Sequence, residues 1–80
     1  MNKEIISLNN LPTDKKARIK DIQGGFGLQR KLSTMGIRKN QDIIILSKQP
    51  FRGPITIQIC GCTITIGQGM AQKIIVEVVQ

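Results

Sequence analysis

Two stretches of alternating isoleucine constrain the fold of this chain more than any other feature. The segments ITIQI at 55–59 and TITI at 63–66 alternate isoleucine with polar residues. A period of two places one set of side chains on a buried face and the other on a solvent-facing one, as in a half-buried strand. Gly61, between the segments, can take the positive φ that a hairpin tip requires. The pattern therefore predicts a β-hairpin.

Three further segments favour strands. Residues 17–22 partly alternate, residues 43–46 form a continuous apolar run, and residues 74–79 close the chain with β-branched side chains. The segment at 67–73 reads as a turn or a single helical turn. Residues 1–16 are only loosely patterned, although Leu8 and Leu11 within them are candidate core anchors.

One short helix is expected between the first two of these strands. Leu28, Leu32 and Met35 recur at the spacing of an apolar helical stripe over 28–35. The glycines at 24–27 would end the preceding strand, and Gly36 suits the position that follows a helix. We expect the stripe to pack into the core. The pattern predicts a mainly β protein, an SH3-like barrel of about five strands, with residues 1–80 forming a single domain.

The charge of the chain is compatible with an acidic partner but does not by itself indicate one. Lys and Arg number 12 against 5 Asp and Glu, which gives a net charge of +7. Nucleic acid, anionic lipid and an acidic protein surface would all suit this charge, and so would a plain lysine-covered surface. The chain lacks an apolar run near the roughly 20 residues of a membrane span and lacks a secretory signal pattern. We therefore expect a cytoplasmic location with reduced thiols.

Cys60 and Cys62 leave three interpretations open: a structural hairpin, a metal site and a redox pair. Two thiolates do not complete a structural zinc site, and the chain has no histidine to add. A site shared between two copies, or capture of a soft metal, stays open. Without histidine, neither cysteine has a neighbouring base in sequence, so we expect a protein that is not an enzyme.

Four segments, taken in order, carry a resemblance to a known family. They are LNNLPTDKKARIKDIQGG at 8–25, RKLSTMGI at 30–37, RGPITI at 52–57 and MAQKIIVEV at 70–78. Their order and spacing resemble the FeoA family of small cytoplasmic accessory proteins in bacterial ferrous iron transport. The same domain type also occurs at the C-terminus of some iron- or manganese-dependent repressors.

Three positions depart from the pattern of that family. Asp14 and Asn40 stand where the family usually has glycine, and both remain turn-forming residues. Met70 stands where an acidic residue is frequent, which argues against a metal or charge role at this position. The cysteine pair is also outside the family pattern, which favours the hairpin interpretation.

The resemblance implies a non-catalytic protein that docks on the cytoplasmic part of the membrane iron permease FeoB, with the permease G-domain as the expected contact. It implies no cofactor of its own and no small-molecule substrate, since ferrous iron is the transported ion. It also implies a location at the inner membrane through the partner. Two alternative functions are a basic nucleic-acid-binding barrel and direct transition-metal binding at Cys60 and Cys62. Single-strand binders use aromatic stacking platforms, and two phenylalanines supply few of these.

Exposed loops are the expected contact regions, because binding residues concentrate on loops held by a rigid scaffold. The two candidate segments are 24–31 and 50–54. The partner-contact candidates within them are Gly25, Phe26, Arg30, Lys31, Phe51 and Arg52.

Overall fold

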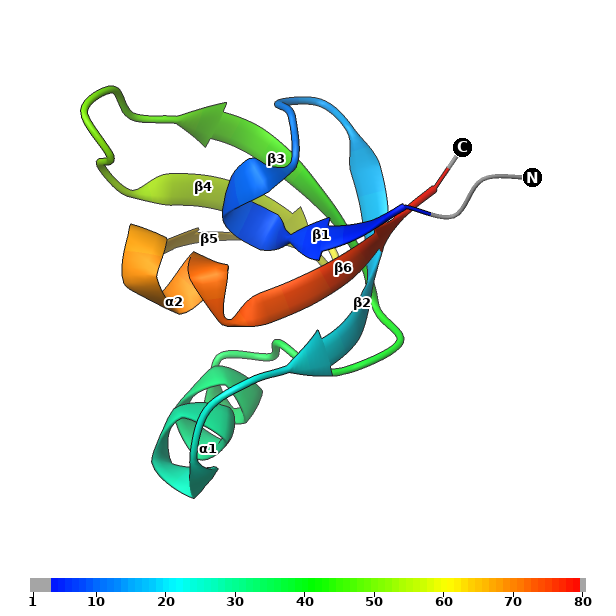
Figure 1. Ribbon diagram of the computed structural model, residues 1–80, viewed down its shortest axis with the longest axis vertical. Coiled ribbons are helices and arrows are strands. Elements are labelled where there is room, and N and C mark those ends of the chain that lie inside the picture. The colour runs from blue at the N-terminus through cyan, green and yellow to red at the C-terminus, as the bar shows by residue number, and fades with distance from the viewer. Residues whose placement is uncertain (1–3, 80) are drawn as a thin grey trace.

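A computed structural model describes residues 4–79 as one strongly curved antiparallel sheet with two short helices (Figure 1). The strands are β1 (Ile5–Ser7), β2 (Lys16–Ile22), β3 (Asp42–Lys48), β4 (Ile55–Ile59), β5 (Cys62–Ile66) and β6 (Ile74–Val78). The helical elements are the 3-10 turn η1 (Leu8–Asn10) and the α-helices α1 (Phe26–Thr34) and α2 (Gln68–Gln72). The expected mainly β, SH3-like architecture is confirmed.

The sheet has six strands in the order β1-β6-β2-β3-β4-β5, one strand more than the pattern predicts. The additional strand is β1, which pairs with β6 through Ile5 opposite Glu77 and Ser7 opposite Ile75. A strand of three residues is too short to show alternation, so only its pairing with β6 defines it. As a result α1 follows the second strand of the chain rather than the first.

The interior of the barrel is aliphatic. No charged or polar residue is buried in the part of the chain that the structure describes. Leu8 and Leu11 are fully buried, as expected of anchors, and η1 carries the first of them. The buried side chains are Leu8, Leu11, Ala17, Ile19, Ile22, Leu32, Ile37, Ile43, Ile45, Ile55, Ile57, Ile59, Ile66, Ala71, Ile74, Val76 and Val78.

Helix α1 ends in a Schellman motif that fixes its apolar stripe against the core. Gly36 has φ +89, its N–H donates to the Ser33 carbonyl at 3.0 Å, and the Ile37 N–H donates to the Leu32 carbonyl at 2.9 Å. Leu32 and Ile37 are both fully buried, while Leu28 and Met35 are half-buried against the core. The expected helix stop and the expected inward stripe are therefore confirmed.

The turn residues that replace glycine adopt the glycine-like conformation. Asp14 has φ +67 and Asn40 has φ +69. The Asp14 N–H donates to the Ile45 carbonyl at 2.8 Å, and the Asn40 N–H donates to the Ile19 carbonyl at 2.7 Å. Short polar side chains tolerate left-handed φ, so these two departures from the family pattern leave the fold intact.

Candidate interaction surfaces

The turn between β3 and β4 carries the most exposed apolar residue of the described chain. Phe51 is 99% exposed, and Arg52 beside it is exposed as well. Both adopt left-handed backbone conformations, with φ +58 and +63, and the Gly53 N–H donates to the Pro50 carbonyl at 3.2 Å to close the turn. Left-handed φ costs a residue with a side chain roughly 1–2 kcal/mol. The turn is strained, and burial of the Phe51 and Arg52 side chains does not offset this cost, because both are exposed.

Position 53 of this turn requires glycine, because there is no space for a side chain there. A Cβ at this position would lie 2.7 Å from the Gln49 Cβ and 3.2 Å from the Pro50 carbonyl oxygen. Real Cβ atoms do not approach other atoms so closely, so a side chain here would force the turn apart.

The start of α1 presents the second exposed aromatic side chain. Gly25 occupies the N-cap position and has no side chain with which to cap the helix. Phe26, the first helical residue, is 92% exposed. Arg30 and Lys31 follow on the same helix and are exposed. The helix begins two residues earlier than its apolar stripe indicates. The Gln29 N–H donates to the Gly25 carbonyl at 3.1 Å as the first helical hydrogen bond, and Gln29 Nε2 donates to the Gly24 carbonyl at 3.2 Å.

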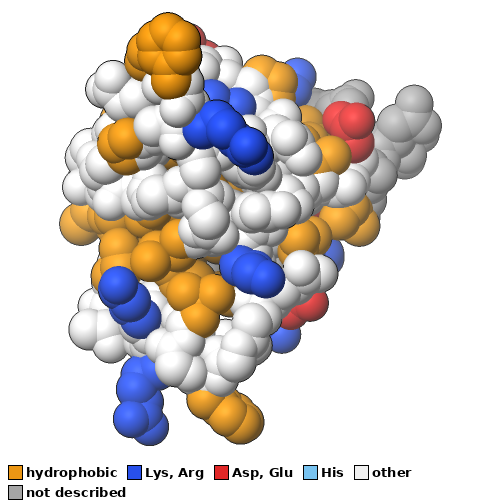
Figure 2. Space-filling model, turned by 60° about the vertical axis from the view of Figure 1, so that its left-hand side comes forward, with side chains coloured by type: hydrophobic (Ala, Val, Ile, Leu, Met, Phe, Trp, Pro, Cys, Tyr) orange, Lys and Arg blue, Asp and Glu red, His pale blue; other side chains and the backbone are white. Residues whose placement is uncertain are grey.

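All six partner-contact candidates are therefore exposed, but they lie in two separate groups. The β3–β4 turn and α1 stand at opposite ends of the long axis of the molecule (Figure 1). Figure 2 shows apolar side chains gathered between the barrel and the lobe formed by α1, with Lys and Arg side chains around them. Apolar surface bordered by charge marks binding sites more often than scattered apolar residues do.

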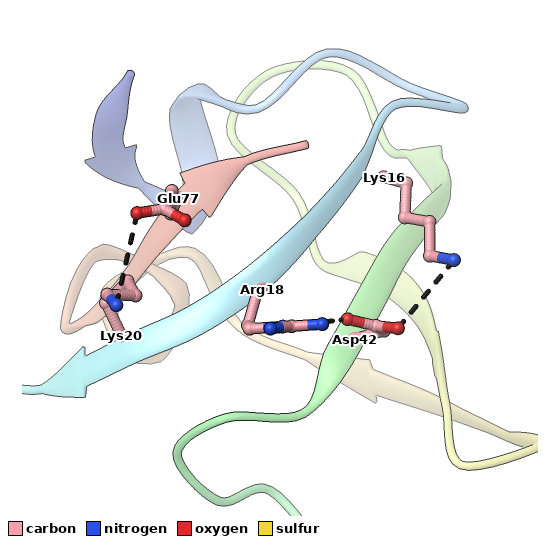
Figure 3. Close-up of polar contacts among 5 residues, drawn as sticks. All are labelled: Lys16, Arg18, Lys20, Asp42 and Glu77. Carbon is pink, nitrogen blue, oxygen red and sulfur yellow. Dashed lines mark hydrogen bonds and ion pairs between the residues drawn. The ribbon is translucent and has the colours of Figure 1, made fainter. Parts of the chain in front are cut away.

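Two of the carboxylates, those of Asp42 and Glu77, lie on the outer face of the sheet and are paired there with cations, while Asp21 pairs with Lys39 at 3.4 Å. Asp42 lies 3.2 Å from Arg18 Nε and 3.7 Å from Lys16 Nζ, and Glu77 lies 3.9 Å from Lys20 Nζ (Figure 3). These pairs lie on the outer face of β2, β3 and β6 and are exposed enough to contribute only about 0–1 kcal/mol each to stability.

A depression of about 240 Å³ lies beside these pairs. It is lined by Lys16, Asp42, Ile43, Ile44 and Gln58. Its charged residues, Lys16 and Asp42, already contact each other at 3.7 Å. The depression therefore offers a ligand little unpaired charge.

Seven cations have no carboxylate within 4.0 Å among the described residues. They are Lys15, Arg30, Lys31, Arg38, Lys48, Arg52 and Lys73. Lys48 donates to the Asn9 carbonyl at 3.1 Å instead. Arg30, Lys31 and Arg52 lie in the same two segments as the exposed phenylalanines.

The cysteines occupy the turn between β4 and β5. Gly61 has φ +77, as the hairpin prediction requires, but Cys60 has φ +52 and forms the turn with it. Cys62 is the first residue of β5, opposite Ile59. The two cysteines therefore do not flank the turn symmetrically. Both thiols are free and exposed, and Gln41 Nε2 lies 3.1 Å from Cys60 Sγ.

The described residues hold neither a cluster of metal-ligating side chains nor a helix that could cross a membrane. Within residues 4–79, no group of three or more His, Cys, Asp or Glu side chains is placed to hold a metal ion. Cys60 and Cys62 supply two ligands where a structural zinc site takes four. Across the same residues, none of the helices has the length and apolar character needed to cross a membrane.

Comparison with protein families and solved structures assigns this arrangement to a family. The FeoA domain model matches residues 6–78. A Methanocaldococcus jannaschii protein that carries the provisional name Fe(2+) transport protein A is 37% identical over 59 residues, which cover 74% of this chain and 70% of the relative.

Solved structures with the same fold come from two functional groups. A crystal structure of an iron uptake regulatory protein, FeoA, superposes with a TM-score of 0.89 at 29% identity, covering 95% of this chain and all (100%) of that one. An FeoA-like protein from Clostridium acetobutylicum gives 0.87 at 30% identity, covering 100% and 92%. A manganese-dependent transcriptional repressor gives 0.88 at 20% identity, covering 99% of this chain and 44% of that one, which shows a shared fold alone.

Proposed function

The chain belongs to the FeoA family, and we propose that it is a cytoplasmic accessory protein of ferrous iron transport that docks on the cytoplasmic part of the FeoB permease. The family match over residues 6–78 and the iron transport names of its relatives support the transport role. In this proposal ferrous iron is the cargo of the permease, and the chain is held at the inner membrane by its partner.

The single observation that carries the docking proposal is the exposure of both aromatic residues. Phe26 is 92% exposed and Phe51 is 99% exposed, whereas no other large apolar residue among residues 4–79 exceeds the 58% of Ile5. Burying one such side chain in a partner is worth roughly 1.5–3 kcal/mol. Aromatic side chains are common binding hot spots, and two of them, one on α1 and one on the β3–β4 turn, can anchor the protein at separate points.

The unpaired cations add electrostatic attraction to these anchors. Arg30, Lys31 and Arg52 lie in the same two segments as the phenylalanines and have no carboxylate partner among the described residues. Such charges raise the association rate with an acidic surface more than they raise the affinity, and salt screens them. We therefore expect the docking surface of the permease to be acidic with apolar pockets.

The test is a calorimetric titration of the purified chain with the cytoplasmic domain of the FeoB permease from the same organism. Phe26→Ser and Phe51→Ser should each weaken binding about tenfold, corresponding to about 1.4 kcal/mol. Ile5→Ser is the matched control, because Ile5 is also exposed, at 58%, but lies on β1 at the far edge of the sheet.

Two results would contradict the proposal. One is no heat of binding at permease concentrations of about 100 µM at either of two well-separated temperatures, which excludes a Kd tighter than that value. The other is an equal loss of affinity in the control and in the phenylalanine variants, since this would show that exposed apolar area in general, rather than these two anchors, drives the contact.

A further inference from the structure

Strand β5 ends the sheet with an unpaired edge. It pairs with β4 alone, and Ile59 opposite Cys62 is the pair next to the two-residue turn. In such a hairpin this pair is hydrogen-bonded, and hydrogen-bonded and non-hydrogen-bonded pairs then alternate along the ladder. Thr63 and Thr65 consequently direct their N–H and C=O groups away from β4. Neither residue takes part in the backbone hydrogen bonds described between other elements.

This edge lacks the shortening, the charged residues and the proline that commonly block further strand pairing. Edge strands are commonly shortened, or carry lysine or proline. The opposite edge, β1, has three residues, whereas β5 has five with the sequence CTITI. No Asp, Glu, Lys or Arg occurs between residues 53 and 72. The chain therefore presents a neutral, β-branched edge of full strand length.

Apolar surface lies beside the open edge. In Figure 1, β5 lies on the side of β4 that faces α1, and Figure 2 shows apolar side chains gathered between the barrel and α1. Ile64 on β5 and Met70 on α2 are half-buried against the core, as are Leu28 and Met35 of the α1 stripe. A strand added to β5 would place alternate side chains on this apolar surface.

The charges around this region indicate what kind of strand fits. Arg30, Lys31, Arg38 and Lys73 lie on α1, just after it, or just after α2, and have no carboxylate partner among residues 4–79. Figure 2 shows Lys and Arg side chains at the borders of the apolar region and no Asp or Glu within it. The surroundings of the open edge therefore favour an acidic segment.

We propose that the β5 edge takes up an extended acidic segment of the permease as an added strand. Main-chain hydrogen bonds from Thr63 and Thr65 supply the pairing, alternate apolar residues of the segment cover the surface toward α1, and its carboxylates meet the surrounding cations. This inference rests on the proposed docking function and specifies its geometry. A second copy of this chain is a poorer occupant, because it brings its own net charge of +7 to the same cations.

The test removes one backbone donor while leaving the hairpin intact. Thr63→Pro deletes the outward N–H of Thr63 without deleting a hydrogen bond to β4, and proline is tolerated at such edge positions. Thr63→Val is the matched control, because it also loses the hydroxyl but keeps the N–H. Each variant is titrated with the same permease domain, after circular dichroism and thermal melting confirm the fold.

We expect Thr63→Pro to weaken permease binding at least tenfold and Thr63→Val to change it less than twofold, since the lost interaction is a backbone one. If both variants bind as the unmodified chain does, the strand-addition proposal is wrong while docking by the phenylalanines stands. If the unmodified chain does not bind the permease, the docking function fails and this inference with it.

Hydrogen exchange on the unmodified chain provides a measurement that does not depend on folding of the proline variant. The amides of Thr63 and Thr65 should exchange at least tenfold more slowly in the permease complex. The Ile64 amide, which already faces β4, should change little. Equal exchange of the threonine amides in the free and bound chain would overturn the proposal. Sedimentation of the chain alone tests the other occupant, because self-association that Thr63→Pro abolishes would assign the edge to a second copy.

Discussion

Each of the two turns that flank β4 has two successive residues at positive φ, but the residue types at these positions differ. At the β4–β5 turn, Cys60 and Gly61 have φ +52 and +77, and glycine takes one of the two left-handed positions without steric cost. At the β3–β4 turn, Phe51 and Arg52 have φ +58 and +63, so two large side chains occupy positions that favour Asn and Gly.

The difference in residue type suggests that the β4–β5 turn is selected for closing its hairpin, whereas the β3–β4 turn is selected for exposing Phe51 and Arg52. The β4–β5 turn has small residues and lies within the uncharged part of the chain, so it closes the hairpin at little cost. The β3–β4 turn holds an almost fully exposed phenylalanine beside an unpaired arginine. Strain that persists without internal compensation is a motivation for proposing a binding role, and an exposed phenylalanine beside an arginine suits the apolar and acidic partner surface proposed above.

The largest effect is expected from Gly53→Ala in the β3–β4 turn. The new Cβ would lie 2.7 Å from the Gln49 Cβ, and the resulting overpacking should destabilise the protein by roughly 2–3 kcal/mol. Urea unfolding at constant temperature measures the change. A loss below about 0.5 kcal/mol would show that the turn relaxes easily and holds no fixed conformation.

The double variant Phe51→Asn with Arg52→Gly tests whether exposing these two side chains lowers the free energy of unfolding of the protein. Asn-Gly is the preferred pair for this kind of turn, so relief of strain should stabilise the protein by roughly 1–3 kcal/mol. Binding to the permease domain should weaken about tenfold in the same variant. Greater stability with unchanged binding would remove the functional explanation of the strain.

Gly61→Ala tests the other turn. Open space surrounds the Gly61 Cα, so only the φ of +77 opposes a side chain, and we expect a loss of about 1 kcal/mol. Thermal melting detects a change of this size in a small domain. A loss as large as that of Gly53→Ala would mean that the two turns do not differ in packing as described.

The smallest effect is expected from Cys60→Asn, which completes an Asn-Gly pair. We expect a stabilisation of roughly 0.5 kcal/mol, because Asn tolerates left-handed φ better than Cys and only the contact from Gln41 to the sulfur is lost. The same variant tests the metal interpretation. Saturable shifts of amide resonances with ferrous iron in the unmodified chain that vanish in this variant would assign a metal role to Cys60.

Most of the fold could be predicted from the sequence where the pattern is local. Strand β4 matches its predicted span, and β5 and β2 begin one residue earlier than predicted. Strand β3 continues to Lys48 beyond its apolar run. Strand β1 could not be predicted, because its three residues are ordered by β6, which lies more than 60 positions away in register pairs such as Ile5 with Glu77.

The sequence predicts which exposed segments form the candidate site, but not how these segments are placed relative to one another in the fold. Composition marks Phe26 and Phe51 as the only aromatic residues, and aromatic side chains are ordinarily well buried, so their near-complete exposure had no signal in the sequence. Left-handed φ was predictable at Asn40 and Gly61 from residue type, but not at Phe51 and Arg52, where the residue type argues against it. The open β5 edge follows from strand order, which local patterns do not give.

The pairing of β1 with β6 has a consequence for how this domain can be built into larger proteins. The Val78 N–H donates to the Glu4 carbonyl at 2.8 Å, so the two ends of the described chain lie side by side. In Figure 1 both ends are on the side of the molecule away from α2 and β5. A longer polypeptide can therefore carry the domain as a module attached at a single point, with both tethers leaving together. Fusion or surface immobilisation at either end therefore leaves the β5 edge accessible for the proposed strand pairing.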